Sequence, residues 1–254
     1  VLNVKGRTDE AWRDGLDIIV ATDHMSIRPV KDTEGQPTPA DVVAKRGARV
    51  AKAVTEVTKM GEKYGLLVIP GVELTGDAKT QGHFNALFTT DNNAVYAPET
   101  IESIRNAKKQ GALVMHNHPG WRHTDMKITK YEKRVYDAGL LDGIEIMNGA
   151  EFYPQAIERA KKYNLFMSSN TDAHQPTAER YGRYGALRNM TIIFAKDKSE
   201  KSLREAIEAR RTLALSFGTL AGEETLVRKV FEATVSARKT VVDYKNRAEV
   251  ILTN

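Results

Sequence analysis

Short runs of consecutive apolar residues recur along the chain, separated by segments in which apolar residues have helical spacing. The runs lie at residues 17–21, 66–69, 83–88, 112–115, 143–147, 165–167, 190–194 and 212–215. Because they are continuously apolar rather than alternating, they are typical of strands in a sheet that is covered on both faces.

The spacers between these runs predict helices. The helical segments are 39–64, 98–110, 128–138, 153–163 and 198–210. Pro98 stands in a first turn, and Gly65 and Gly111 follow as stop signals. Alternating strands and helices predict an α/β fold, either a β/α barrel or a doubly wound sheet. The alternation breaks down at 241–253, where AEVILTN predicts a strand. We therefore expect a barrel domain over residues 1–237 and an extension over 238–254 that begins a small β element.

Polar residues with catalytic potential stand just beyond the apolar runs. His24 follows the first run, Glu73 the second and His118 the fourth, while His83 opens the third. In parallel barrels, the carboxyl ends of the strands form the active-site face. The stretch SSNTDAH, residues 168–174, adds Asp172 and His174. In an extended backbone these two would point to the same side. We therefore expect all of these side chains at one rim.

Each of these residues has an ordinary structural explanation when it is taken alone. A single Asp or Thr after a strand is usually a cap or turn residue, and a lone histidine is more often a core residue than a ligand. The joint pattern changes that balance. Five of the six histidines stand at strand ends or starts, and only His123 lies deeper in a loop. The set as a whole favours a shared site.

Composition narrows the chemistry of that site. The 254 residues, 41% of them hydrophobic, suit one large α/β domain or two small ones. The formal charge of +5 is spread along the chain, so it is compatible with a phosphorylated small substrate and indicates no specific nucleic-acid partner. The absence of cysteine excludes disulfides, thiolate zinc sites and cysteine nucleophiles. No G-x-S-x-G elbow, dinucleotide fingerprint or P-loop is present. Histidines with carboxylates suit zinc, manganese or iron.

The sequence contains no membrane-spanning pattern. No apolar run approaches the roughly 18 residues that a spanning helix needs. A cytoplasmic location is the default expectation, and a chain that starts at Val1 rather than methionine leaves room for a removed leader.

Six motifs together resemble the polymerase and histidinol phosphatase (PHP) superfamily. GLDIIVATDH, VIPGVEL, GHFNALF, HNHPGW, GIEIMNG and NTDAH occur in the family's order across roughly residues 9–220. The resemblance implies a distorted (β/α)7-type TIM-like barrel with a trinuclear metal centre. It makes His24 a metal ligand and Glu73 the carboxylate that bridges two metals. His83 and His118 would complete one metal's shell, with His118 preferred to His116 because it directly precedes Pro119. Asp172 and His174 would divide between the other two metals.

One family motif is missing. The family begins with an H-x-H pair on its first strand, followed by a third histidine. VLNVKG resembles the approach to that strand, but RTDEAW already reads as the next helix. Either a segment between Gly6 and Arg7 is absent, which the abrupt change favours, or the chain is a degenerate member. The metal site formed by Glu73, His83 and His118 keeps three protein ligands. The other two metal sites of the family's centre have too few protein ligands in this sequence. Three ions per chain are expected only if the N-terminal ligands exist.

The resemblance implies metal-dependent hydrolysis of a phosphoester, in a phosphorylated small molecule or a nucleotide-like substrate. Glu73, Asp172 and His174 would be the catalytic residues around a metal-activated water. The candidate phosphate-binding residues are Arg122, Arg180 and Arg183. For each of them, the interpretation as an ordinary solvated surface arginine is at least as well supported by the sequence. Two alternatives remain open. One is an amidohydrolase-type metal hydrolase that cleaves C–N bonds, and the other is a non-catalytic PHP-like domain that binds metal or ligand.

Overall fold

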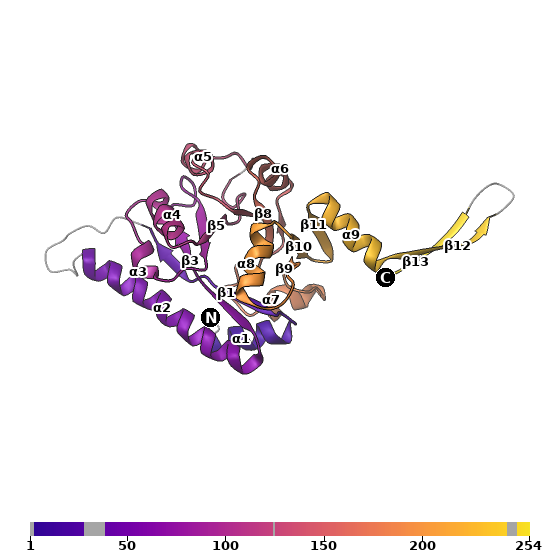
Figure 1. The fold of residues 1–254 in the computed structure, drawn as a ribbon, viewed down its shortest axis with the longest axis horizontal. Helices are drawn as coiled ribbons and strands as arrows, with labels where there is room; N and C mark the ends of the chain where they lie inside the picture. Colours follow the sequence, from indigo (N-terminus) through magenta and orange to yellow (C-terminus); the bar gives the residue numbers. More distant parts are fainter. Residues whose placement is uncertain (1–2, 28–38, 124, 243–247) are drawn as a thin grey trace.

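Strands and helices alternate through most of the chain in the computed structural model (Figure 1). The structure describes residues 3–27, 39–123, 125–242 and 248–254. The strands are β1 Ile18–Ala21, β2 His24–Ser26, β3 Leu67–Thr75, β4 His83–Leu87, β5 Leu113–His116, β6 Gly143–Asn148, β7 Glu151–Phe152, β8 Phe166–Asn170, β9 Met190–Ile193, β10 Thr212–Ser216, β11 Thr219–Gly222, β12 Ser236–Val242 and β13 Ala248–Thr253. The helices are α1 Val4–Arg13, α2 Pro39–Tyr64, α3 Asn92–Val95, α4 Thr100–Lys109, α5 Lys130–Asp137, α6 Pro154–Tyr163, α7 Thr177–Tyr181, the 3₁₀ helix η1 Gly182–Tyr184, α8 Glu200–Glu208 and α9 Glu224–Thr234.

The main sheet is mixed and curls into a half-barrel. β1 and β2 pair in succession along one edge of β3, both parallel to it. β4 is antiparallel to β3 and β5, whereas β5, β6 and β8 are parallel neighbours. β4 therefore departs from the parallel strand arrangement of a regular β/α barrel. The reason is the short loop 76–82 between β3 and β4, since a parallel connection needs a crossover of a dozen or more residues.

The later strands form a separate antiparallel sheet in the order β11–β10–β9. It is joined to β8 through side chains: Ser169 Oγ donates to the carbonyl of Leu215 (3.0 Å), and Thr212 Oγ1 donates to that of Met167 (2.7 Å). The apolar runs at 190–194 and 212–215 are thus strands, as expected. They pair with each other, and the second of them with β11, rather than with the strands of the main sheet. The seven-strand count of the expected barrel stays a prediction.

Apolar side chains cover both faces of the main sheet. One cluster of buried residues includes Val72, Phe84 and Ile144, and a second includes Ile69 and Leu113. Phe84 is completely buried, and each such side chain contributes roughly 1.5–3 kcal/mol. Burial on both sides explains why these strands are continuously apolar in the sequence.

The two ends of the chain differ in how well the sequence predicts them. The Asn3 side chain accepts a hydrogen bond from the Gly6 N–H (2.9 Å) and caps α1, so the expected strand at VLNVKG is wrong where the structure describes it. At the other end, AEVILTN is a strand, as predicted. It pairs with β12 in a hairpin that projects away from the rest of the molecule beyond α9 (Figure 1). The boundary at 237/238 stays a prediction.

None of the helices in the described part of the chain has the length and apolar character that a bilayer crossing requires.

Candidate metal centre

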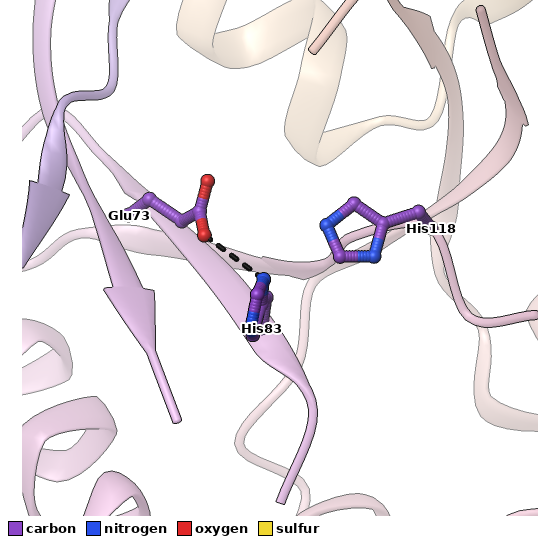
Figure 2. A group of neighbouring side chains, drawn as sticks. All are labelled: Glu73, His83 and His118. Atoms are coloured by element: carbon purple, nitrogen blue, oxygen red, sulfur yellow. Dashed lines mark ion pairs between the residues drawn. The ribbon is translucent and has the colours of Figure 1, made fainter. Parts of the chain in front are cut away.

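Three buried side chains from adjacent strands converge at one rim of the sheet. Glu73 lies on β3, His83 opens β4, and His118 follows β5 (Figure 2). Each offers a ligand atom, and these atoms all lie within 4.8 Å of one another. The Nδ1 of His83 is 3.1 Å from the Oε1 of Glu73. Because β4 is reversed, its first residue lies beside the carboxyl ends of β3 and β5, and this explains why His83 begins its strand.

The protonation states of this cluster suit metal binding. Burial opposes ionisation of Glu73, but hydrogen bonds from His24 and His83 outweigh it and hold the pKa of the Glu73 carboxyl well below its usual range. Burial, assisted by the nearby His83, lowers the pKa of His118 to about 4. At neutral pH the cluster therefore presents a carboxylate and a neutral His118 imidazole. Two histidines with one glutamate form a donor set used by catalytic zinc sites, so these residues fit a divalent cation.

His24 extends the cluster on the far side of Glu73. It is the partner of Glu73 in the β2–β3 register. Its Nδ1 lies 3.0 Å from Glu73 Oε1 and 2.9 Å from Thr75 Oγ1, and its Nε2 lies 3.3 Å from the Nε2 of His174. The hydrogen bond with Glu73 raises the pKa of His24. The His24 and His174 side chains are 44% and 65% exposed, so this half of the centre is open to solvent. Among the described residues, only Glu73, His83 and His118 have three ligand atoms so close together.

Asp172 and His174 converge by a different route from the expected one. β8 ends at Asn170, and Asp172 has a left-handed φ of 46°. The expected extended backbone is therefore wrong at Asp172. A short polar side chain such as that of Asp tolerates this turn conformation. The turn itself joins the pair: His174 Nδ1 donates to the Asp172 carbonyl (2.9 Å) and lies 3.6 Å from Asp172 Oδ1. Burial, together with the charge of Glu73, raises the pKa of Asp172, and a cation would relieve this repulsion.

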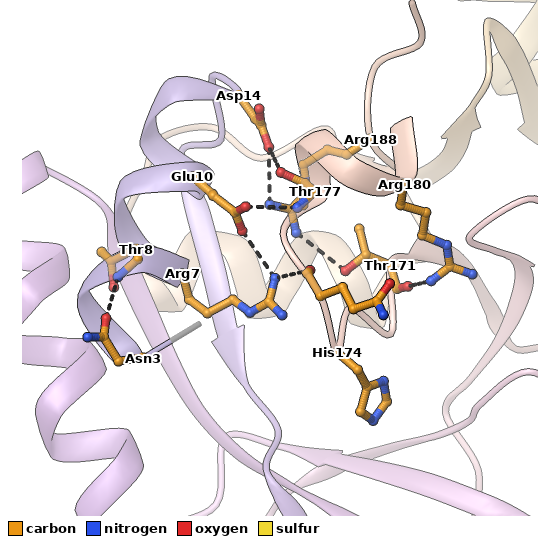
Figure 3. A network of polar contacts seen from close by, with 12 residues as sticks. Asn3, Arg7, Thr8, Glu10, Asp14, Thr171, His174, Thr177, Arg180 and Arg188 are labelled. Carbon is orange, nitrogen blue, oxygen red and sulfur yellow. Dashed lines mark hydrogen bonds and ion pairs between the residues drawn. The ribbon is translucent and has the colours of Figure 1, made fainter. Parts of the chain in front are cut away.

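The first helix holds the loop that carries this pair (Figure 3). Arg7 Nη1 donates to the carbonyl of Gln175 (2.8 Å) and pairs with Glu10 (3.1 Å). The other carboxylate oxygen of Glu10 accepts the Thr177 N–H (2.8 Å). Two residues of α1 thus fix the backbone immediately after His174.

Two arginines hold the same loop before Asp172 (Figure 3). Arg188 lies 3.4 Å from both Asp14 Oδ2 and Thr171 Oγ1, and Arg180 Nη1 donates to the Thr171 carbonyl (2.7 Å). The sequence does not predict these contacts, since they form only when α1 and the segment that carries the arginines pack against the loop.

Glu145 connects the two halves of the centre and was not among the predicted site residues. It is buried on β6 and accepts hydrogen bonds from the His118 N–H, from Asn148 Nδ2 (3.0 Å) and from Asn170 Nδ2 (2.8 Å). His118 has a φ of 26°, so its backbone conformation needs such support. Burial raises the pKa of Glu145 to about 7. GIEIMNG was a matching motif, but no local pattern gives its glutamate a role.

His116, which the family resemblance ranked behind His118 as a ligand, has partners elsewhere. Its Nδ1 is 2.8 Å from the Tyr136 hydroxyl, and its Nε2 is 3.3 Å from Glu132 Oε1. Both ring nitrogens therefore have protein partners in the core, and burial lowers the pKa of His116.

The predicted phosphate-binding arginines occupy three different settings. The Arg122 guanidinium lies 4.7 Å from the Trp121 ring, which in turn contacts the rings of His83 and His118 at 5.4 and 5.2 Å. Arg180 adjoins Asp172 through its contact with Thr171 and packs over Gly149, where a Cβ would lie 1.9 Å from its Nη2. Arg183 lies in η1, where its Nε donates to the Glu179 carbonyl.

A curled α/β half-barrel with a buried histidine–glutamate cluster at its rim defines a protein with a candidate metal centre of the hydrolase type. No family model matches the sequence, and no curated protein does. Among solved structures, a two-domain protein from Bacteroides vulgatus, described as containing a predicted PHP-like metal-dependent phosphoesterase, is 32% identical. The match covers 100% of this chain and 71% of that one, with a TM-score of 0.80. The chain therefore belongs to the PHP superfamily, as the motifs indicated.

Two more distant structures share the fold. A protein from Bifidobacterium adolescentis assigned as a metal-dependent phosphoesterase is 15% identical, with 83% of this chain and 91% of that one covered and a TM-score of 0.50. The lesion-specific endonuclease of Pyrococcus furiosus is 17% identical, with 81% and 50% covered and a TM-score of 0.51.

Proposed function

We propose that this chain is a metal-dependent hydrolase of phosphoesters. The observation that carries the proposal is the buried trio of Glu73, His83 and His118, whose ligand atoms lie within 4.8 Å of one another. The named function of the Bacteroides vulgatus relative supports the same reaction class. The expected substrate is a phosphorylated small molecule or a nucleotide-like ester.

The trio would hold one zinc, manganese or iron ion. His24, Asp172 and His174 would hold further cations, up to three in total where additional N-terminal ligands exist. Glu73 suits a bridging role, because its Oε1 faces both His24 and His83 at 3.0 and 3.1 Å. When bound, such ions supply Lewis acidity that lowers the pKa of water and stabilises charge on phosphoryl oxygens.

The chain's own residues would orient the ester. Arg122 stacks on Trp121, whose ring contacts His83 and His118, so its guanidinium would bring a positive charge toward the trio. Arg180 places a second cation beside Asp172. Planar guanidinium groups bind phosphate oxygens in a bidentate manner, so these two arginines would grip the phosphoryl group. Arg183 is a third candidate further along the same segment.

Metal content and turnover test this proposal together. Protein loaded with zinc, manganese or iron is expected to hydrolyse p-nitrophenyl phosphate or bis(p-nitrophenyl) phosphate faster than a p-nitroanilide, and the preferred ester separates monoesterase from diesterase activity. Glu73→Gln should lose both bound metal and turnover. Glu56→Gln, the same change on the exposed face of α2, should lose neither.

Each alternative has its own outcome in this assay. Faster cleavage of the anilide would replace the phosphoesterase with a C–N hydrolase. Bound metal without turnover of any of these compounds would leave a binding domain. An active Glu73→Gln variant would remove the mechanism.

A further inference from the structure

A small cavity adjoins the candidate metal centre. His83 and His118 form part of its wall, and its volume is about 10 Å³, which is room for one water-sized group. Its lining also includes the polar side chains of Asn117, His116, His123 and Glu132 and the ring of Trp121. Any group bound in this cavity would therefore lie next to a substrate held at the metal ligands.

The two carboxylate oxygens of Glu132 have different surroundings, and the one that faces the cavity contacts its histidines. Oε2 accepts the Thr129 N–H (2.8 Å) as part of the capping box of α5. Oε1 lies 3.3 Å from His116 Nε2 but 4.0 Å from His123 Nε2. The second distance is too long for a hydrogen bond, and one intervening oxygen atom spans a gap of that size.

Asn117 adds an unused acceptor. It is 4% exposed, it lines the cavity, and its Oδ1 is one of the buried polar atoms without a hydrogen-bond partner among the described residues. A buried polar atom of this kind costs free energy until it is paired.

Gly82 keeps the space in front of Glu132 open. A Cβ at this position would lie 3.0 Å from Glu132 Oε1 and 3.1 Å from His116 Nε2. The φ of Gly82 is +77°, a conformation that favours glycine. Any larger residue would fill the space between the carboxylate and the wall of the cavity.

We propose that this cavity binds one hydroxyl group of the substrate's alcohol portion, so that the substrates are phosphoesters of diols or larger polyols. The inference rests on the proposed phosphoesterase function and adds the class of alcohol. A hydroxyl can donate to Glu132 Oε1 or Asn117 Oδ1 and accept from His123 Nε2–H, whereas an ammonium cannot accept and a methyl can pair with neither Asn117 Oδ1 nor His123 Nε2–H. The Glu132 carboxylate repels phosphoryl oxygens, which places the phosphate toward the metal ligands and the alcohol in the cavity.

Matched esters with and without the hydroxyl test the proposal. The pairs are 2-hydroxyethyl phosphate with ethyl phosphate, and bis(2-hydroxyethyl) phosphate with diethyl phosphate. Metal-loaded wild-type protein should favour the hydroxylated member by about ten-fold or more in kcat/KM, because the analogue leaves buried polar groups unpaired. Asn117→Leu and His123→Phe should each reduce that preference toward equality while p-nitrophenyl ester turnover continues. Asp125→Asn, an exposed change on the same loop, should keep the preference.

Equal rates for both members of each pair, or a preference that survives in both variants, would overturn the subsite. If no ester is hydrolysed at all, the proposed function fails, and calorimetric binding of the two monoesters to metal-loaded protein decides the subsite separately. Tighter binding of 2-hydroxyethyl phosphate that is lost in His123→Phe supports it. Equal binding, or none, overturns it.

Discussion

Replacing Glu145 by alanine should weaken both halves of the metal centre and the fold around them. The change removes the acceptor for three donors: the His118 N–H and the side-chain amides of Asn148 and Asn170. Each buried donor left unpaired costs about 1–3 kcal/mol, so the low end alone gives a loss of about 3 kcal/mol. This is a large share of the roughly 5–15 kcal/mol by which domains are stable. Glu145→Gln keeps the shape and one acceptor oxygen, so it should lose about 1 kcal/mol.

The same variants should separate stability from metal binding. His118 depends on Glu145 for its backbone conformation, and residues that orient ligands typically contribute about 10–100-fold to metal affinity. We expect a loss in this range for Glu145→Ala and a smaller loss for Glu145→Gln. Urea unfolding of metal-free protein measures the first effect, and competition with a chelator measures the second. Glu158→Ala, an exposed change on α6, should alter neither. A Glu145→Ala protein with wild-type unfolding and wild-type metal affinity would refute the reasoning.

Three further predictions concern the metal, the first helix and acid stability. A divalent metal at about 100 times its Kd should stabilise the protein by about 2.7 kcal/mol and raise Tm by roughly 5–10 °C. A Tm that does not change when zinc, manganese or iron is added would count against the metal site. Glu10→Ala leaves the Thr177 N–H unpaired, so it should lower kcat while metal still binds at the buried trio. Metal analysis and steady-state kinetics on the same variant measure the two effects. An unaltered kcat would mean that α1 does not position the loop. Burial opposes ionisation of Glu132, but its hydrogen bond with His116 lowers the pKa of its carboxyl in the folded protein. The contribution of Glu132 to folding stability is therefore fully present above its ordinary pKa of 4.5, and it is lost as the pH falls through the lowered folded-state pKa. The stability difference between wild type and Glu132→Gln should therefore be full at neutral pH and shrink in acid, and a difference that does not vary with pH would contradict this.

The sequence predicted those parts of the molecule that local patterns determine. Helix α2 and the apolar strands follow from residue spacing and burial. The rule that the carboxyl ends of barrel strands form one face correctly predicted that Glu73 and His118 lie at the same rim. His83 reached that rim for a reason that the pattern did not contain, namely the reversal of β4. The short β3–β4 connection was the available signal, because it leaves no room for a crossover helix.

Other features depend on contacts that no local window contains. Glu10 meets Thr177, and Glu145 meets Asn170, through side-chain hydrogen bonds across the fold. Glu132 is an intermediate case. Thr129 and Glu132 form a capping box that the sequence T-x-x-E announces, but the second contact of this glutamate, with His116, comes only from tertiary packing.

The reversal of β4 also divides the surrounding chain by how freely it can diverge. Leu87, at the end of β4, is paired with both Gly71 and Leu113, so the long connection through α3 and α4 starts and finishes at the end of these strands that is opposite to His83. Insertions there can accumulate without reaching the histidines. The loop 76–82 instead contributes Ala78 and Gly82 to the cavity wall. Relatives that exchange one substrate for another should therefore differ first in these few residues, while the barrel behind them stays the same.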